Sequence, residues 1–398
     1  MHLALVTAYP PSKGSLNEYG YHFVKALAAK PNVKVSVVAD TLLGERSSEE
    51  RLDDVDVRHV WSFNSTGNAW AIAKTLNHLE PDAVIFNLQF ASFGDKRVPA
   101  ALGLLAPWLS SRKRPTVTLL HNLFETVDLK SAGFDRNPLV DAATRFAGGI
   151  FTRALLKSDL VALTMPRYVS ILQEKYGATN LFHAPHGSFD EPRPVEPLPD
   201  VPTVMTFGKF GTYKKVEVLL EAHARLLEHD PRVRLVIAGS DSPNAKGYLA
   251  SVEKSYHLPN VTYTGYVAEE EVPRIFSDST VVAFPYESTT GSSGVLHQAG
   301  QFGRAAVMPR IGDLADLVED EGYAARFFTP GDVESLTTSL RDVLFNREDA
   351  QRLGLQNHAA SALTLSEVAD DYLRRLRELQ ETRWTSANTP TAQNTSTS

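Results

Sequence analysis

The sequence contains no cysteine, which excludes disulfides, thiolate metal sites and a cysteine nucleophile. It also has no run near the roughly 18 uninterrupted apolar residues that a membrane-spanning helix needs. The opening apolar run, 1–6, has no basic segment before it and is too short for a signal peptide, so we expect it to be a first strand. We therefore expect a cytoplasmic protein, and leave open peripheral contact with the inner face of a membrane.

A basic excess is missing as well. The chain has 40 Lys and Arg against 47 Asp and Glu, a formal net charge of −7. Proteins whose main partner is nucleic acid carry a clear positive excess. We therefore expect no nucleic-acid partner, and any basic site must be local.

What the sequence does contain is two series of short apolar segments that alternate with helical ones. This alternation predicts parallel strands with crossover helices, and thus an α/β fold of two Rossmann-like domains that face each other across a ligand-binding cleft. The expected strands are 3–6, 33–38, 83–86, 116–120 and 160–163 in the first series, and 204–207, 233–238, 261–264, 281–284 and 305–308 in the second. Helices are expected over 215–228 and 334–344.

A proline-rich stretch without periodicity, RPVEPLPDVP from Arg193 to Pro202, separates the two series. A polar stretch with almost nothing to bury ends the chain, and we expect it to be disordered. The predicted organisation is a first domain over 1–190, a linker over 191–202, a second domain over 203–365, a helix over 366–384 and a disordered tail over 385–398. One option for the helix is that it packs back onto the first domain.

Two glycine- or lysine-rich segments follow strands of the second series. Gly208 and Lys209 end one strand, and Lys214 and Lys215 open the next helix. Two lysines five residues apart beside a helix N-terminus suit a diphosphate, although a solvated basic loop is the plain alternative. The loop 289–294, rich in Ser, Thr and Gly, also lies between a strand and a helix, where backbone N–H groups and the helix dipole favour a phosphate; a flexible loop is the alternative there.

Several segments follow one another over about 203–345: GKFGTYKKVEVLLEAH from Gly208, VRLVIAGS from Val233, NVTYTGYV from Asn260, VPRIFSDSTVVAFPY from Val272, GSSGVLHQAGQFGRAAV from Gly291 and IGDLADLVEDEGYAARFFTPGDVESL from Ile311. Their order and spacing resemble the donor domain of the family 4 retaining glycosyltransferases, which have the GT-B fold. This resemblance implies a nucleotide-sugar donor held by the second domain and an acceptor on the first domain.

The resemblance also implies roles for single residues. The basic pair on the donor diphosphate falls on Lys209 and Lys214, and the family's glycine after this pair is replaced by Lys215. The family's pair of glutamates seven residues apart is altered: its members fall on Thr290 and Gln298, and it stays open whether Glu287 replaces the first. The donor-binding residues implied are Gly208, Glu287, Thr290, Gly291, Ser292, Ser293, Gly294, Val295 and Gln298.

The first domain matches the family more loosely. A strand there ends at His121, which resembles the family's histidine beside the reacting sugar, although a lone histidine at a strand end is often structural. The turn after the first strand holds Gly14, Ser15 and Asn17, and the strand 83–86 is followed by Asn87 and Gln89. These five are acceptor-side or phosphate-loop candidates, with an ordinary connection as the alternative. The basic run 112–114 suggests contact with anionic lipid, or else a solvated helix end.

Metal-ligand spacings are absent from the sequence: the twelve histidines form no H-x3-H or H-E-x2-H pattern, and no Asp-x-Asp follows a strand in the position where a metal-dependent transferase would hold its cation. We therefore expect no metal and no cofactor, the nucleotide sugar being a substrate. The expected activity is retaining transfer of a hexose to a glycan or lipid-linked acceptor in polysaccharide or glycoconjugate synthesis, with His121, Lys209 and Lys214 as catalytic residues. The alternatives are a nucleotide-sugar epimerase, a phosphorylase and a non-catalytic sugar-binding relative. For a phosphorylase, the sequence shows no signal of the cofactor-lysine site that it would need.

Overall fold

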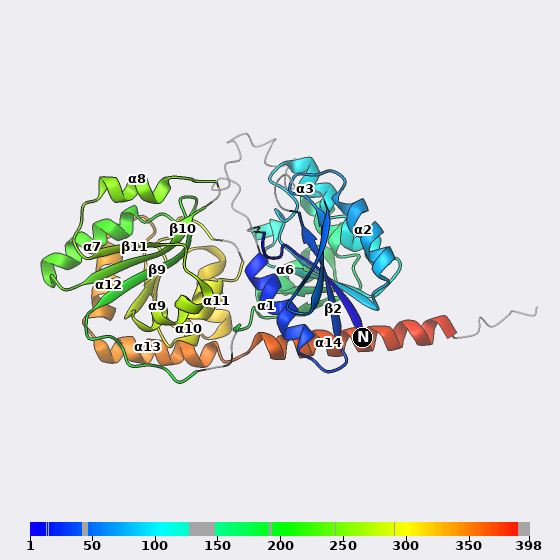
Figure 1. Ribbon diagram of the computed structural model, residues 1–398. Coiled ribbons are helices and arrows are strands. Elements are labelled where there is room, and N and C mark those ends of the chain that lie inside the picture. The colour runs from blue at the N-terminus through cyan, green and yellow to red at the C-terminus, as the bar shows by residue number, and fades with distance from the viewer. Residues whose placement is uncertain are drawn as a thin grey trace, which may run out of the picture.

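The computed structural model describes residues 1–12, 14, 16–41, 47–126, 148–189, 191, 193–242, 244–289 and 291–388. They form two α/β units side by side, each built on its own sheet (Figure 1). Each sheet is buried on both faces by helices, which is why its strands are nearly continuous runs of apolar residues.

The first sheet has the strand order β3-β4-β2-β1-β5-β6-β7-β8. All its neighbours pair in parallel except β3, which runs antiparallel to β4 at one edge. The order reverses between β1 and β5, and ligands of such sheets bind where this reversal occurs. The strands are β1 His2–Val6, β2 Lys34–Asp40, β3 Ser48–Leu52, β4 Val55–Trp61, β5 Ala83–Leu88, β6 Thr116–Leu120, β7 Leu160–Leu163 and β8 Leu181–His183.

The second sheet is entirely parallel, with the order β11-β10-β9-β12-β13-β14. This is the dinucleotide-binding arrangement, and its reversal lies between β9 and β12. The strands are β9 Thr203–Phe210, β10 Arg234–Asp241, β11 Val261–Gly265, β12 Val281–Ala283, β13 Ala305–Pro309 and β14 Ala325–Phe328.

Helices cover both faces of each sheet. Those of the first unit are α1 Asn17–Ala28, α2 Asn68–Leu79, α3 Arg97–Gly103, α4 Ala106–Ser111 and α6 Pro166–Tyr176, with a 3-10 turn η1 at Phe124–Thr126. Those of the second are α7 Glu217–His229, α8 Tyr248–Ser255, α9 Val272–Ser277, α10 Gly294–Gln301, α11 Gly312–Glu321, α12 Val333–Leu344 and α13 Arg347–Ala360, with η2 at Glu269–Glu271.

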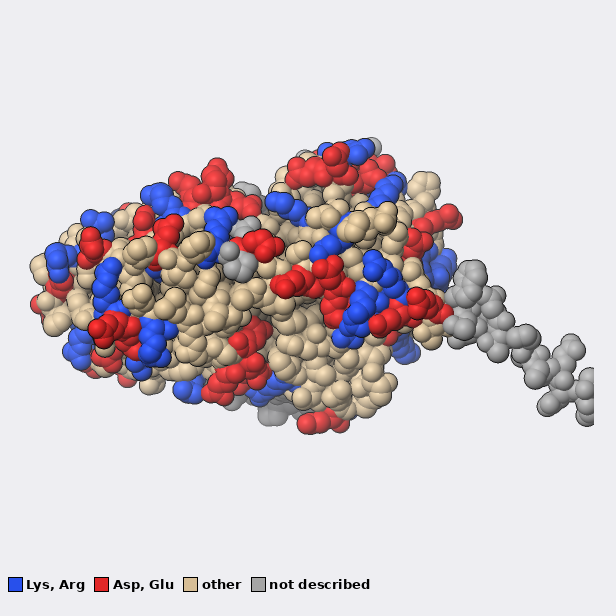
Figure 2. Space-filling view, turned by 90° about the horizontal axis from the view of Figure 1, so that it is seen from below, with Lys and Arg blue, Asp and Glu red and all other residues tan. Residues whose placement is uncertain are grey.

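The last helix, α14 (Leu365–Asn388), returns to the first unit and lies beneath it in Figure 1. Its residues from Leu365 to Leu376 share a core with β1, β2 and α1, and Lys30, which follows α1, donates to Asp370 over 2.6 Å. Seen from the side of α13 and α14, acidic and basic side chains are interspersed over both units (Figure 2). In the described part of the chain, no helix has the length and apolarity to cross a membrane.

The ten strands expected from the sequence are all present, with ends that differ by a few residues. Four further strands, β3, β4, β8 and β14, were not expected. β3 (SEERL) and β14 (ARFF) are short, and β4 (VDVRHVW) alternates buried and half-buried residues instead of forming an apolar run. The last described helix, α14, extends to Asn388. The exact domain borders stay a prediction.

Candidate functional site

The carboxyl ends of both sheets meet at the boundary between the two units. His121 follows β6 of the first sheet, and Gly291 belongs to the loop between β12 and α10 of the second. A Cβ atom on Gly291 would lie 2.1 Å from the carbonyl oxygen of His121, so the two backbones are in direct contact. The reversal points of both sheets therefore open onto one shared site.

A chain of hydrogen bonds fixes His121 inside this site. The Thr7 hydroxyl donates to the carbonyl of Ala8 (3.0 Å), so its oxygen accepts from Nδ2 of Asn87 (2.9 Å). This turns Oδ1 of Asn87 toward Nε2 of His121, 2.7 Å away, and Nε2 must carry the hydrogen. Nδ1 of His121 is therefore the acceptor nitrogen of a neutral ring.

Three buried histidines gather here. Burial lowers the pKa of His121 to about 3 and that of His186 to about 4, and it holds the pKa of His297 well below its usual value. His186 follows β8, and its ring stacks on that of His297 of α10 at 4.7 Å. Tyr19 of α1 contacts the edges of His121 and His186, with ring centroids 4.6 and 4.8 Å away. All three imidazoles are uncharged near neutral pH and serve as hydrogen-bonding and packing groups.

The turn between β9 and α7 places Lys214 over Gly208. Nζ of Lys214 would lie 2.8 Å from a Cβ on Gly208, whose φ of +136° also favours glycine. The same ammonium lies 4.7 Å from the ring centroid of Tyr286. Gly208 leaves the space that the Lys214 ammonium occupies at the end of β9, and the Tyr286 ring packs beside it.

Lys209 lies on the exposed end of β9, and a carboxylate faces both lysines across the boundary. Glu18, in the first turn of α1, has a pKa raised by desolvation and by the charge of Glu269, whereas Lys209 and Lys214 act to lower it. The two lysines therefore contribute positive potential that reaches the first unit.

Lys215, at the position where the family has glycine, forms an exposed ion pair with Glu287 at 3.0 Å. The two chain segments are also joined by backbone bonds from Lys215 N to the carbonyl of Pro285 and from Glu287 N to the carbonyl of Tyr213. The lysine that replaces the family's glycine thus pairs with the glutamate nearest to the altered glutamate motif.

His297 hydrogen-bonds to the loop before α10. Nε2 of His297 lies 2.9 Å from the Ser292 hydroxyl, and its Nδ1 lies 2.7 Å from the hydroxyl of Tyr323. Ser293 caps α10, its side chain accepting from Leu296 N. The N–H groups of Gly294 and Val295 open the helix, where no intrahelical acceptor exists and the helix dipole favours an anion.

Asp313 ties this loop to the first unit. Its Oδ2 accepts from Gly291 N (2.8 Å), from the Tyr168 hydroxyl of α6 (2.6 Å) and from the Thr126 hydroxyl of η1 (3.2 Å). The carboxylate is almost fully buried, so these three donors stabilise its charge. One side chain of the second unit thereby sets the position of the loop relative to the first.

Residues 201–346 match the family of glycosyl transferases group 1. Over 158 residues the chain is 30% identical to the sulfoquinovosyl transferase SQD2 of Arabidopsis thaliana, an alignment that covers 39% of this chain and 29% of that protein. This part of the chain belongs to the group 1 glycosyl transferases. The chain spans about a third of the length of the curated relatives that it matches.

Solved structures of similar fold extend over nearly the whole chain. Sucrose-phosphate synthase from Thermosynechococcus elongatus superposes with a TM-score of 0.74 at 16% identity, covering 96% of this chain and all of that one. Anabaena HepE, solved with UDP and glucose, superposes with a TM-score of 0.66 at 16% identity, covering 94% of this chain and 99% of that one. These likenesses show the fold, which is the two-domain GT-B architecture expected from the sequence.

In the first unit, the turn after β1 is held onto Asp40. Ser12 donates to Oδ2 of Asp40, Gly14 N donates to the Ser12 hydroxyl (3.1 Å), and Nδ2 of Asn17 donates to the Ser12 carbonyl (2.8 Å). Gln89 lies after β5, its N–H bonded to Ser92. Gln298 is half-buried in α10. The other two expected site residues, Ser15 and Thr290, lie outside the described residues.

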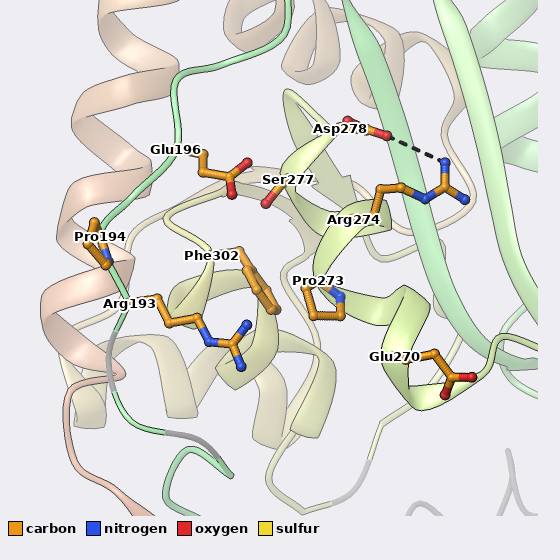
Figure 3. Close-up of a pocket in the computed structure, with 9 residues that line it drawn as sticks. All are labelled: Arg193, Pro194, Glu196, Glu270, Pro273, Arg274, Ser277, Asp278 and Phe302. Atoms are coloured by element: carbon orange, nitrogen blue, oxygen red, sulfur yellow. Dashed lines mark ion pairs between the residues drawn. The ribbon is translucent and has the colours of Figure 1, made fainter.

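A cavity of about 310 Å³ lies apart from this site, between the segment that leaves the first unit and α9 (Figure 3). Its walls carry two guanidinium and three carboxylate groups, and Arg274 faces Asp278 at 3.9 Å. None of the expected site residues lines it. The lining residues are Arg193, Pro194, Glu196, Glu270, Pro273, Arg274, Ser277, Asp278 and Phe302.

Four residues of the boundary were not expected from the sequence: Glu18, His186, His297 and Asp313. Asp313 follows Gly312 in the first turn of α11, where a carboxylate is common, and His297 directly precedes Gln298. The local sequence around Asp313 predicts only an aspartate in the first turn of a helix. It does not show that the carboxylate also accepts hydrogen bonds from the first unit. Their role depends on the contact between the two units.

Proposed function

We propose that the protein is a retaining glycosyltransferase that moves a hexose from a nucleoside-diphosphate sugar to a glycan or lipid-linked acceptor. The observation that carries the proposal is that three groups share one boundary: the Lys214 ammonium, the start of α10, and the uncharged His121. The first two suit a diphosphate, and the third suits a sugar hydroxyl. The membership of 201–346 in the glycosyl transferases group 1 and the likeness to HepE, solved with UDP and glucose, support the donor class.

In the proposed reaction, the bond between the anomeric carbon and the diphosphate oxygen breaks while a bond to the acceptor oxygen forms on the same face. The acceptor proton passes to the departing phosphate oxygen. Lys209, Lys214 and the N–H groups at the start of α10 stabilise the negative charge that grows on the diphosphate. These cations and N–H groups supply the electrostatic stabilisation, so we propose a reaction without a metal ion.

His121 would hold the donor sugar. Its Nδ1 accepts a hydrogen bond, because Nε2–H is already donated to Asn87. A neutral ring in this place also avoids a cation beside the anomeric carbon, where positive charge develops as the glycosidic bond breaks. Closure of the two units around the donor would exclude water and so limit its hydrolysis.

The test is turnover of a panel of nucleotide sugars with and without candidate acceptors, after thermal-shift screening of the corresponding nucleoside diphosphates. A donor at ~100 times its dissociation constant should stabilise the fold by roughly 2.7 kcal/mol. Consumption of donor that requires an acceptor, with retention of the anomeric configuration in the product, would support the proposal. Release of an epimerised sugar without acceptor would indicate an epimerase, and binding without any turnover would indicate a sugar-binding protein.

A further inference from the structure

A row of three hydrogen-bonded side chains joins the interior of the second unit to the loop before α10. The hydroxyl of Tyr323, which follows α11, lies 2.7 Å from Nδ1 of His297, and Nε2 of the same ring lies 2.9 Å from the hydroxyl of Ser292. His297 and Tyr323 are both 4% exposed, whereas Ser292 is half-buried. The row therefore leads from the core of this unit to the loop that we expect beside the donor diphosphate.

Tyr323 sets the direction of the hydrogen bonds along this row. Burial raises the pKa of its phenol and holds the pKa of His297 well below the usual value, so both groups are uncharged near neutral pH. In the described part of the chain, the Tyr323 hydroxyl has Nδ1 of His297 as its hydrogen-bond partner. A buried hydroxyl that donates to nothing is costly, so Tyr323 donates to Nδ1. The single hydrogen of the neutral ring is therefore on Nε2.

Nε2–H of His297 is donated to Ser292. A carboxyl group also lies near this nitrogen, but Oε2 of Glu321 is 3.7 Å away, which is beyond hydrogen-bond range. Burial raises the pKa of Glu321 to about 8, so it has no charge near neutral pH that would attract the ring hydrogen. The Ser292 oxygen thus accepts from His297, and the hydrogen of its own hydroxyl is left for another acceptor.

A histidine of the first unit fixes the plane of the His297 ring. The ring of His186 stacks on it with centroids 4.7 Å apart and planes inclined by 9°. A Cβ on Gly294 would lie 3.7 Å from Nε2 of His186, which places the stacked pair beside the first residue of α10. The His297 ring is therefore held at both nitrogens and on one face, so its N–H has a fixed direction.

The hydrogen that Ser292 can donate suits an anion. A hydroxyl whose oxygen already accepts a hydrogen bond is a stronger donor, because the bonds of such a chain polarise one another. Ser292 lies two residues before Gly294, whose N–H opens α10 together with that of Val295. Phosphate oxygens accept hydrogen bonds and bind at such helix starts. The Ser292 hydroxyl thus adds a third kind of donor to the lysines and backbone N–H groups.

We propose that Tyr323 and His297 are positioning residues, which direct the hydroxyl hydrogen of Ser292 to a phosphate oxygen of the nucleotide-sugar donor. This role rests on the proposed function, because it requires a diphosphate at the start of α10. The resemblance seen in the sequence implied a donor contact for Ser292 but no role for the other two residues. Their effect on the donor passes entirely through Ser292.

The experiment is a double-mutant cycle on the affinity for UDP, GDP, ADP and dTDP, measured by isothermal titration calorimetry. Ser292→Ala should weaken binding of the preferred nucleoside diphosphate about tenfold, because a hydrogen bond to a charged group is lost. Tyr323→Phe should weaken it about fivefold when Ser292 is present, and by no more than about twofold in the Ser292→Ala background. A purely structural effect of Tyr323→Phe would be equal in the two backgrounds.

Two further measurements examine the row itself. Nitrogen NMR of the His297 ring, without ligand, should show the hydrogen on Nε2 in the wild type and a mixture of tautomers in Tyr323→Phe. His297→Gln keeps an N–H donor for Ser292 and should bind the diphosphate more tightly than His297→Leu. Tyr256→Phe is the matched control, because it also removes a tyrosine hydroxyl, one that donates to Glu221 of α7 over 3.1 Å, and its affinity should equal that of the wild type.

Equal losses from Tyr323→Phe in both backgrounds, or a wild-type His297 with its hydrogen on Nδ1, would overturn the positioning role. A loss in Ser292→Ala that appears with nucleotide sugars but not with nucleoside diphosphates would assign Ser292 to the sugar and overturn the phosphate contact. Absence of any nucleotide binding by the wild type would overturn the proposed function together with this role. Binding and transfer by the wild type without the expected coupling would overturn this role alone.

Discussion

His121 and Gly291 meet across the boundary of the two units with no room for a methyl group between them. A Cβ on Gly291 would lie 2.1 Å from the carbonyl oxygen of His121. The N–H of the same glycine is donated to Asp313, which also bonds to Tyr168 and Thr126. The contact therefore positions the expected sugar-binding histidine and the expected phosphate loop relative to each other.

Gly291→Ala should lower turnover about a hundredfold, because displacement of reacting groups by about 1 Å has effects of this size. Gly322→Ala is the control: its φ of +77° is close to the +81° of Gly291, but a Cβ there meets nothing within 4 Å. Both variants should lose about 1–2 kcal/mol of unfolding free energy from left-handed alanine. Gly291→Ala should lose more, because its Cβ also meets the His121 carbonyl. Equal turnover in the two variants would contradict the role of the contact.

Asn87→Ala should lower turnover by about ten- to a hundredfold with little effect on donor affinity, since partners that orient a functional side chain have effects of this order. The reason is that Asn87 keeps the hydrogen of His121 on Nε2. Nitrogen NMR of the His121 ring would show a changed tautomer population. Thr7→Ser keeps the hydroxyl that orients Asn87 and should remain close to wild type, whereas Thr7→Val should resemble Asn87→Ala.

Lys214→Ala should reduce turnover roughly a hundredfold or more, because a cation facing a charged diphosphate in a water-poor site contributes about 3–4 kcal/mol to the transition state. Lys215→Ala removes only an exposed ion pair with Glu287 and should be mild. Steady-state kinetics of both variants with the true donor and acceptor decide the matter. Similar losses in the two would remove Lys214 from the phosphate site.

Stability should fall as the solution becomes acidic. The pKa values of His121 and His186, about 3 and 4 in the fold, lie below the 6.5 of an unfolded chain, so below about pH 6.5 the unfolded state binds more protons. Each such histidine lowers the unfolding free energy by roughly 1.4 kcal/mol per pH unit down to its folded pKa. Urea unfolding between about pH 4 and 8 measures this slope.

Glu321 acts in the opposite direction. Burial raises its pKa to about 8, so the folded state keeps a proton that the unfolded state loses above about pH 4.5, and stability falls as pH rises over that range. Glu321→Gln removes this contribution. The variant should therefore gain stability near neutral pH and show a steeper loss toward acid than the wild type; an unchanged pH profile would contradict it.

Turnover should survive EDTA, because lysines and helix N–H groups are proposed to take the place of a cation on the diphosphate. In the described part of the chain no three His, Asp or Glu side chains gather as metal ligands. Donor consumption before and after chelation is the measurement. Activity that disappears with EDTA and returns with manganese or magnesium would assign the diphosphate to a metal site.

Local pattern was sufficient for ten of the parallel strands and for the loops that follow them. Leu3–Val6 and Val281–Ala283 are apolar runs bounded by turns, and parallel strands buried on both faces have few other forms. The positions of Lys214 and Gly291 at strand ends followed from this order. Asp313 and His186 could not be predicted, because each depends on a partner from the other unit, and β4 exposes part of one face and so lacks an apolar run.

The two chain segments that connect the units are paired with each other. Ser188 N donates to the carbonyl of Leu363, and Leu365 N donates to the carbonyl of Ser188, both over 2.8 Å. In topological terms, the second unit is an insertion between Ser188 and Thr364 of the first. Both connections thus pass between the units side by side, so that a displacement of one chain segment at this point would also involve the other.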